Sequence, residues 1–495
     1  GGGGGGGGGG GFSLVGRQSG QVVDGMVRIG RVRLQTDHVL GHGRSGATVV
    51  LGRFEGKSAA IKVTPLRRSA HWGGRPGAPD AGLLAAREAE ILDRCENENA
   101  HPNVLRLFGV EEAGGSVYLA LELCVASLNE LVTAMREPAA IGSRRRALLG
   151  RLGLMPPPLQ QPTLPASLRR MLEQLLDGLC HLHRLDILHC KLRPSSVLLN
   201  CHGVLKLSGL GLGQLALPGK APDSRQSARN ALAADGFDPA EVLHAMMGGE
   251  QESLSVAAKK AADVFSCGVL IFWTLTGGRH PYGEEPSQRR SQILRGDPVA
   301  LVQLRRLPEA AHLVAQMLSF EPASRPQAEQ ARQHPALWSD EQKLLLVRCV
   351  SDEPELADEA SPFVAAAEGH ATAVYGPEGW CERLHAELFA VLVAHRSYQK
   401  GSIRDLLRAV RNCDHLQGMP LEVQRLLLPR PAGIAAYFLP RFPTLFWTLY
   451  CLVEQHWRTR RVFEPFFAWQ HKAPSRRPTP LSATPPVAPT SLHHL

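Results

Sequence analysis

The sequence of 495 residues has no hydrophobic run that could span a membrane and no regular cysteine framework. Its longest nearly unbroken apolar run surrounds Cys267–Leu275, whereas a membrane span needs about 20 residues. The ten cysteines are scattered, which favours a reducing, cytosolic setting over a disulfide-stapled secreted fold. With 44% hydrophobic and 20% charged residues, the composition excludes a wholly disordered chain.

Neither end of the sequence has the pattern of a folded domain. The chain lacks an initial Met and begins with eleven glycines, so we expect a fragment in which residues 1–28 form a Gly-rich disordered leader. Residues 471–495 are rich in Pro, Ser and Thr and predict a disordered tail. The formal net charge of +9 indicates an anionic partner only weakly.

The ordered part of the sequence predicts an α+β, two-lobed arrangement followed by an all-α domain. Short β-rich runs around one helical stretch, at 83–94, predict a small lobe over about 29–125. Residues 137–165, with three consecutive arginines and three consecutive prolines, predict a surface insertion. Helical periodicity then predicts a larger lobe over about 166–338 and a further helical domain over 339–470.

A glycine-rich pattern near the N-terminus indicates a nucleotide pocket. It fits G-x-G-x-x-G-x-V, in which glycines let the backbone approach phosphates closely. Lys62 lies on the next predicted strand, where a kinase places the lysine that holds the α- and β-phosphates, and Glu88 on the following helix is its natural partner. The candidate nucleotide-binding residues are Gly41, Gly43, Gly46, Val49, Lys62 and Glu88.

Further motifs extend this pattern into a resemblance to the protein kinases across about 29–338. They are HPNV at 101–104, DVFSCG at 263–268, HPYG at 280–283 and Arg325-Pro326. The residues that carry out phosphate transfer in that family are replaced in this sequence. Lys191 stands where the family has its catalytic aspartate. Ser196 and Gly209 stand at the two magnesium-ligand positions. The sequence therefore predicts a pseudokinase.

Nucleotide binding is a separate question, because the glycine pattern and Lys62 are retained. ATP or ADP could act as a regulatory ligand through metal-independent contacts. Alternatively, Lys62 and Glu88 could pair only to hold the helix beside an empty pocket. The Cys and His residues between 180 and 202 lack zinc-type spacing, so we expect packing roles for them and no metal site.

The segment Tyr398–Pro420 is the most informative part of the C-terminal region. Ser402 followed by Asp405 predicts a capping-box start to a helix. Apolar residues then recur at i, i+3, i+4 and i+7, with arginines on the opposite side. The planar guanidinium groups of arginines beside a Tyr and a His suit the binding and cleavage of an RNA phosphodiester. An amphipathic helix with a basic face is, however, common in proteins of any function.

Further motifs follow the kinase-like region: HPALWS at 334–339, VSD at 350–352, the segment Tyr398–Pro420, RFP at 441–443 and VFEPFF at 462–467. In this order they resemble the inositol-requiring enzyme family, the unfolded-protein-response sensors, which share a kinase–nuclease arrangement with RNase L. The resemblance covers about 29–469. It implies a KEN-type endoribonuclease domain at 339–470, RNA as the partner, and a back-to-back homodimer or higher oligomer.

The family reaction needs no metal, and the resemblance gives each candidate residue a role. Tyr398 would help to deprotonate the ribose 2′-OH, and His415 would protonate the leaving 5′ oxygen. Arg411 and Asn412 would hold the scissile phosphate and stabilise its developing charge. The implied product is a 2′,3′-cyclic phosphate, so DNA would not be cut.

One spacing departs from the family pattern. The family places its catalytic histidine four residues after the asparagine, whereas His415 follows Asn412 by three. Counting back from Pro420 restores the match, so a one-residue deletion in the loop could leave His415 in place. Alternatively, Leu416 occupies the acid position and the nuclease is crippled. We favour the deletion, since the other three candidate residues are retained and no other histidine lies nearby.

Three hypotheses follow: an endoribonuclease regulated by a pseudokinase, a catalytically inactive assembly scaffold, and an ATP-dependent Ser/Thr kinase. The replaced residues argue against the third. The implied location is cytosolic, at the face of the endoplasmic reticulum if a membrane-anchored segment precedes this region in the full-length protein. Charge is uneven, since residues 351–390 hold nine acidic residues and one Arg, whereas 391–470 hold eleven Lys or Arg and five acidic residues.

Overall fold

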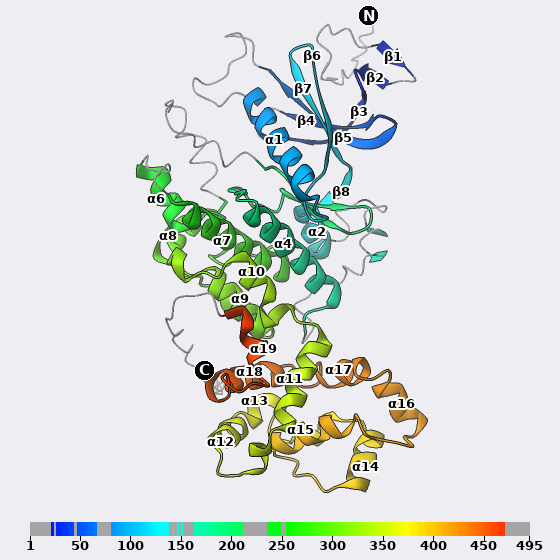
Figure 1. Cartoon of the computed structure of the whole chain (residues 1–495), viewed down its shortest axis with the longest axis vertical. Coiled ribbons are helices and arrows are strands. Elements are labelled where there is room, and N and C mark those ends of the chain that lie inside the picture. Colours follow the sequence, from blue (N-terminus) through cyan, green and yellow to red (C-terminus); the bar gives the residue numbers. More distant parts are fainter. Residues whose placement is uncertain are drawn as a thin grey trace, which may run out of the picture.

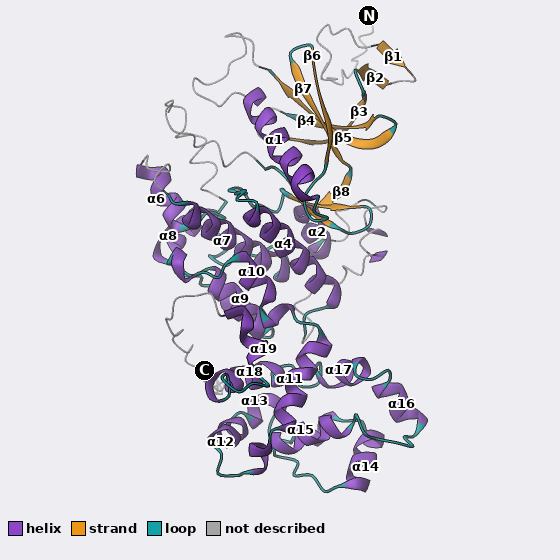
Figure 2. Ribbon diagram, in the orientation of Figure 1, coloured by secondary structure: helices purple, strands orange, loops and turns teal. Residues whose placement is uncertain are grey.

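The computed structural model places three layers of structure along the long axis of the molecule (Figures 1 and 2). A β-rich lobe is followed by a helical lobe and then by a second helical domain, which confirms the predicted α+β class. The structure describes residues 21–23, 26–43, 47–66, 81–137, 142, 146–147, 150–151, 163–210, 235–248 and 254–470. Residues 1–20, Gly46, most of the expected insertion and the expected tail at 471–495 lie outside the described residues.

The first lobe is an antiparallel seven-stranded sheet in the order β1-β2-β3-β4-β5-β7-β6. Its strands are β1 (Gln21–Val23), β2 (Met26–Ile29), β3 (Val32–His42), β4 (Thr48–Phe54), β5 (Lys57–Pro65), β6 (Leu107–Ala113) and β7 (Ser116–Glu122). Helix α1 (Ala81–Asn99) packs against β5, β6 and β7. A disordered leader over all of 1–28 is wrong for the residues of β1 and β2, because these strands pair with each other and β2 pairs with β3.

Strand β7, between β5 and the edge strand β6, is buried on both faces, which explains its unbroken apolar run. Val117, Leu119 and Leu121 join the core that includes α1, whereas Tyr118 and Ala120 join a separate core on the other face. Successive side chains of a strand point to opposite faces, so one short strand serves both cores. This packing fixes the position of β5, its neighbour, which carries Lys62.

The second lobe is mainly helical, with a small sheet in the order β10-β9-β8. Its elements are β8 (Cys124–Ser127), α2 (Leu128–Arg136), α4 (Ala166–Arg184), β9 (Val197–Asn200), β10 (Leu205–Leu207), α6 (Ala240–Gly248), α7 (Val256–Leu275), α8 (Pro286–Arg295), α9 (Pro308–Met317) and α10 (Ala328–Gln333). The longest apolar run of the sequence falls in α7, where it is buried in the lobe's core. None of the helices in the described parts of the chain is long and apolar enough to cross a membrane.

The second helical domain has a core of its own, built around buried aromatic side chains such as Trp380 and Trp457. Its helices are α11 (Asp340–Asp352), α12 (Pro362–Gly369), α13 (Ala371–Tyr375), α14 (Ala386–His395), α15 (Ile403–Asn412), α16 (Leu421–Leu427), α17 (Ala432–Phe438), α18 (Leu445–His456) and α19 (Glu464–Phe467). The predicted all-α character of this region is confirmed.

Packed rings and ion pairs join this domain to the kinase-like lobe. The ring of Trp338, just before α11, lies 5.8 Å from those of Phe446 and Tyr450 in α18. Lys343 of α11 pairs with Glu309 of α9 at 3.0 Å, with both side chains 11% exposed. Because apolar contact and a partly buried ion pair act together, the junction is a continuous packed interface rather than a linker.

Candidate functional site

Three of the predicted nucleotide-binding residues form one row across the first sheet. Gly41 lies opposite Val49, and Val49 lies opposite Lys62. Residues directly opposite each other share a face of the sheet, so these three face the same side. A Cβ at Gly41 would meet no atom of the described residues within 4 Å, so there is open space at Gly41 itself. Gly43 follows the end of β3, where its N–H donates to Ala47 O at 2.7 Å.

Lys62 and Glu88 form the ion pair that the sequence predicted. The ammonium of Lys62, on β5, donates to a carboxylate oxygen of Glu88 on α1. The side chains are only 16% and 5% exposed, so little water screens the pair. This pair fixes α1 against the sheet and holds the ammonium on the face that carries Gly41 and Val49.

The loop equivalent to a kinase catalytic loop is fully formed. Asp263 of α7 is 1% exposed and accepts from the backbone N–H groups of His189 (2.9 Å) and Cys190 (2.7 Å). The Nε2 of His183 is 3.1 Å from the same carboxylate, and His181 stacks on His101. These contacts give four of the Cys and His residues of this region, His181, His183, His189 and Cys190, roles in packing and in shaping the loop. The described residues contain no group of three or more His, Cys, Asp or Glu that could hold a metal ion.

A kinase fold implies Mg²⁺, but the residues at the metal-ligand positions do not fit it. The Ser196 hydroxyl accepts from the Arg193 N–H at 2.9 Å and lies within hydrogen-bond distance of its carbonyl, so it is used within its own loop. Gly209 has a φ of +73°, and a Cβ there would lie 3.8 Å from the Cβ of Ser196. The two positions therefore adjoin as in a metal site, yet neither supplies the carboxylate oxygen that Mg²⁺ prefers.

Arg193 is locked into the same region by two carboxylates. Its guanidinium pairs with Asp238 at 2.6 Å and with Asp235 at 3.1 Å, and it lies over the Phe237 ring. The side chain is 4% exposed. Burial would lower the pKa of this guanidinium, but the two aspartates outweigh that effect and raise it. Both acidic groups are thus engaged with a cation and balance its charge.

The helix at the heart of the second domain, α15, begins at the N-cap Ser402, as predicted. Ser402 Oγ accepts from Asp405 N at 3.3 Å, but the reciprocal half of the expected capping box is wrong. The Asp405 carboxylate instead accepts from Gln399 N at 2.7 Å, because the chain turns back just before the helix. Glu368 of α12 completes the cap, accepting from Ser402 Oγ (2.7 Å), Ile403 N (2.8 Å) and Arg404 N (3.1 Å). Sequence reasoning missed Glu368, which lies more than thirty residues away.

Two of the four predicted nuclease residues are in direct contact. The amide Nδ2 of Asn412, the last residue of α15, donates to the Tyr398 phenol oxygen at 2.7 Å. The Tyr398 ring packs edge-on against Trp380, with centroids 5.8 Å apart. Burial raises the pKa of the Tyr398 phenol, and the Asn412 hydrogen bond acts in the opposite direction.

Trp380 is a second residue that sequence reasoning missed. It is fully buried, its indole N–H donates to Gln399 O at 3.1 Å, and its backbone N–H donates to Lys400 O at 3.1 Å. Gly379, just before it, has a φ of +93°, and a Cβ there would lie 2.6 Å from Lys400 O. The turn after Tyr398 therefore packs so closely against Gly379 that only glycine, which has no Cβ, fits there.

Arg411 lies beside the Tyr398–Asn412 pair along α15 and is 32% exposed. Its guanidinium donates to Ser351 O at 3.1 Å and lies 3.4 Å from the exposed carboxylate of Asp352. The contact with Asp352 is long and solvated, so an incoming anion can compete for this guanidinium. The apolar face of α15 is buried as predicted, at Ile403, Leu406, Leu407 and Val410.

The two candidates for the acid position differ in exposure. His415, in the turn after α15, is exposed, and its backbone N–H donates to Asn412 O at 3.0 Å. Leu416 is buried, with 8% of its surface exposed. Of these two residues, only His415 has a titratable side chain, and this side chain is exposed to solvent.

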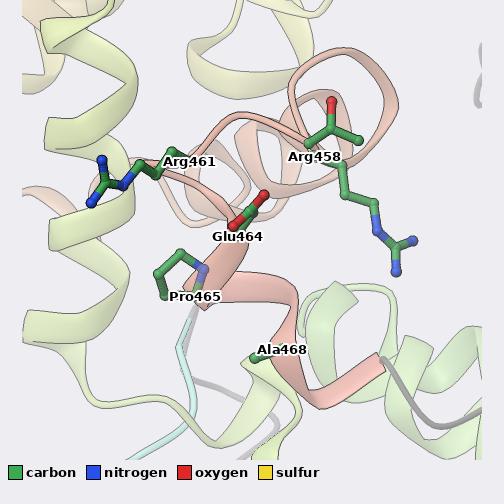
Figure 3. Close-up of a pocket in the computed structure, with 6 residues that line it drawn as sticks. Arg458, Arg461, Glu464, Pro465 and Ala468 are labelled. Carbon is green, nitrogen blue, oxygen red and sulfur yellow. The ribbon is translucent and has the colours of Figure 1, made fainter.

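A hollow of about 680 Å³ lies elsewhere in this domain and contains none of the candidate residues. Figure 3 shows Arg458 and Arg461 extending to opposite sides of it, with Glu464 between them. Arg458 lies 3.7 Å from Glu454 and over the Phe467 ring. The arginine charges of this hollow are thus spread apart and partly compensated.

Comparisons with known proteins agree with this two-part architecture. Residues 34–337 match the protein kinase domain family, and residues 343–467 match the ribonuclease 2-5A family. The human serine/threonine-protein kinase/endoribonuclease IRE2 is 33% identical, covering 91% of this chain and 44% of the relative.

Two further relatives come from distant organisms. The Schizosaccharomyces pombe sensor for unfolded proteins in the ER ire1 is 29% identical, covering 88% of this chain and 39% of the relative. The Arabidopsis thaliana serine/threonine-protein kinase/endoribonuclease IRE1b is 29% identical, covering 88% and 48%. The chain spans less than half the length of these three relatives. It belongs to the inositol-requiring enzyme family, with a protein kinase domain followed by a ribonuclease 2-5A domain.

Proposed function

We propose that this chain is a metal-independent endoribonuclease regulated by dimerisation through a pseudokinase, and that it acts in a response to unfolded proteins at the cytosolic face of the endoplasmic reticulum. The observation that carries the proposal is the hydrogen-bonded pair of Tyr398 and Asn412, with Arg411 beside it and His415 exposed at the end of the same helix. The names of the relatives, which join a kinase to an endoribonuclease, support it.

Each group has a distinct part in RNA cleavage. Arg411 and Asn412 donate to the scissile phosphate and stabilise charge that develops on its oxygens. The ribose 2′ oxygen attacks phosphorus and the bond to the 5′ oxygen breaks, giving a 2′,3′-cyclic phosphate. His415 gives its proton to the leaving 5′ oxygen. Because the Tyr398 pKa is raised, its phenol is protonated at neutral pH and takes the 2′ proton only as its own proton passes to a phosphate oxygen.

In the kinase domain, the same proposal assigns binding without phosphoryl transfer. Lys191 introduces a cation where the family has a base, and Ser196 and Gly209 provide no carboxylate for Mg²⁺. Lys62, held by Glu88 in the same row as Gly41, remains able to contact the phosphates of ATP or ADP. Nucleotide would then stabilise the lobe arrangement from which back-to-back dimers form.

The test is cleavage of a stem-loop RNA by the purified dimeric chain in EDTA. We expect cleavage with a cyclic phosphate end, reduced to a slow residual rate in His415→Ala and strongly reduced in Tyr398→Phe. Tyr375→Phe is the matched control, since its buried phenol oxygen has no hydrogen-bond partner among the described residues. It should cleave like the unmutated chain.

Three results would contradict the proposal in whole or in part. An unmutated dimer that cleaves no RNA, with or without Mg²⁺, leaves the assembly scaffold as the function. Incorporation of labelled phosphate from ATP that disappears in Lys62→Ala would establish an active Ser/Thr kinase instead. Cleavage at the unmutated rate in His415→Ala would remove the acid role from that residue.

A further inference from the structure

One arginine, Arg430, binds the backbone carbonyl groups of the residues on both sides of His415. Arg430 lies in the connection between α16 and α17, fifteen residues further along the chain. Its Nη1 donates to Asp414 O and its Nη2 donates to Leu416 O, each at 2.7 Å. The planar guanidinium thus holds the carbonyl groups immediately before and after His415.

Other contacts hold the same turn at its two ends. Nη2 of Arg430 also approaches Met419 Sδ at 3.3 Å, and Gln424 Nε2 donates to Met419 O at 2.8 Å. At the other end, the Arg348 guanidinium of α11 pairs with Asp414 at 2.7 Å. The turn from 414 to 419 is therefore held from three different helices or connections, although its central histidine is exposed.

The imidazole of His415 makes no hydrogen bond to any residue that the structure describes. The structure therefore holds His415 through its backbone, whose two flanking carbonyls are those that Arg430 binds. The fork suits this task because two parallel N–H donors from one rigid plane fix two acceptors relative to each other. The turn also lies where the sequence is one residue shorter than the family spacing, so a family-like path cannot be assumed for it.

We propose that Arg430 is a positioning residue for RNA cleavage, which holds the shortened turn so that His415 reaches the leaving oxygen. This role rests on the proposed nuclease function. In this proposal Arg430 acts on the turn and not on the RNA. Among the described residues it donates to backbone carbonyls and a thioether, and its buried Nε has no hydrogen-bond partner there, so its contribution passes through the geometry of the turn.

The experiment compares Arg430→Ala with Arg425→Ala in the full-length dimer. Arg425 is exposed on α16, so the control removes the same charge from the neighbouring helix without touching the turn. We expect Arg430→Ala to lower kcat by about tenfold to a hundredfold with KM unchanged, since a misplaced acid slows the chemical step rather than binding. Arg430→Lys should fall between, because one ammonium nitrogen cannot reproduce the spacing of two guanidinium nitrogens.

A double variant separates positioning from a general loss of stability. In the His415→Ala background, Arg430→Ala should cost no further activity, because it acts through the group already removed. Amide hydrogen exchange supplies a readout that does not depend on RNA. Arg430→Ala should speed exchange in residues 414–419 while leaving α15 protected.

The outcomes distinguish this proposal from the one on which it rests. If the unmutated dimer cleaves RNA through His415 but Arg430→Ala matches Arg425→Ala, the positioning role alone is overturned. Equal losses in the presence and absence of His415 would show a merely structural role. If the unmutated dimer does not cleave RNA, the proposed nuclease fails and the role of Arg430 fails with it, whatever the exchange rates show.

Discussion

The amide of Asn412 donates a 2.7 Å hydrogen bond to the phenol oxygen of Tyr398 and so joins the end of α15 to the turn that precedes it. The same turn is held at Gln399 by Asp405 and by Trp380. The position of the phenol is thus determined by contacts at both ends of one helix. A tyrosine held in this way can act at a fixed distance from Arg411 and Asn412, the proposed phosphate-binding residues, which is what proton transfer requires.

Replacing Asn412 should change both the titration of Tyr398 and RNA cleavage. Its hydrogen bond stabilises the phenolate, so Asn412→Ala should raise the pKa of Tyr398 further above its ordinary value. Loss of one donor to the phosphate should reduce kcat by about a hundredfold. The titration can be followed by the ultraviolet difference between each protein and its Tyr398→Phe counterpart. An unchanged or lowered Tyr398 pKa would contradict the assigned direction of the hydrogen bond.

The uneven charge along the C-terminal region shows where sequence reasoning was incomplete. Residues 391–470 carry a basic excess, and the sequence places it at the candidate RNA site. In the fold, the acidic segment lies against that region. Arg404 pairs with Glu359, and Arg411 lies within reach of Asp352. A local sum of charges along the chain cannot detect this compensation, because the partners lie about fifty residues apart.

Local signals predicted α15 well but could not supply its support. The apolar period places the buried face correctly, and Ser402 marks the first turn. The groups that hold the site, Glu368, Trp380 and Arg430, come from other elements. Each of them contacts backbone atoms at least in part. Such contacts do not depend on the type of the partner residue, so they leave no pattern in the sequence that would predict them. The kinase motifs were easier to interpret, since each has a fixed order and spacing.

Nucleotide should stabilise the chain equally well in EDTA and in Mg²⁺, because the metal-ligand positions hold Ser196 and Gly209. At a free ADP concentration about a hundredfold above Kd, binding to the folded state adds about 2.7 kcal/mol, visible as a higher Tm. Lys62→Ala should abolish the shift. Lys57→Ala, at an exposed position on the same strand, is the control. A shift that requires Mg²⁺ would show that a metal site exists after all.

Removing the remote cap of α15 should destabilise the nuclease domain. Glu368 accepts three hydrogen bonds at the helix start, where a carboxylate also interacts favourably with the helix dipole. Glu368→Ala should lower the free energy of unfolding by about 1–2 kcal/mol, measured by urea denaturation with tryptophan fluorescence. Glu378→Ala is the matched control, since Glu378 is exposed in the same domain. Equal midpoints for the two variants would exclude a capping role for Glu368.

The junction between the kinase-like lobe and the nuclease domain contains a pair of neutral histidines. His334 Nδ1 accepts from Ala336 N at 3.1 Å, so its Nε2 carries the proton and donates to His312 Nδ1 at 2.9 Å. The ring of His312 lies 4.9 Å from that of Trp447, and the ring of His334 lies 5.1 Å from that of Trp469. Burial lowers the pKa of His312 to about 4 and that of His334 well below its ordinary value.

This pair makes the stability of the chain depend on pH in a defined direction. In the unfolded chain these histidines bind protons near pH 6.5, whereas His312 in the fold resists protonation down to about pH 4. Between these values the unfolded state holds more protons, so the free energy of unfolding rises with pH. The contribution of His312 is fully present above about pH 6.5 and amounts to about 3 kcal/mol, lost progressively as the pH falls towards 4.

Urea denaturation across this pH range tests whether His312 causes the pH dependence. Replacing His312 by a side chain that does not titrate should remove its part of the change in the free energy of unfolding with pH. His312→Gln should flatten the dependence between pH 7 and pH 4.5 even if it lowers stability at neutral pH, since only the protonation difference is lost. His202→Gln, at an exposed turn of the kinase-like lobe, should leave the slope unchanged. If both variants keep the slope of the unmutated chain, the pH dependence arises elsewhere and His312 is not its source.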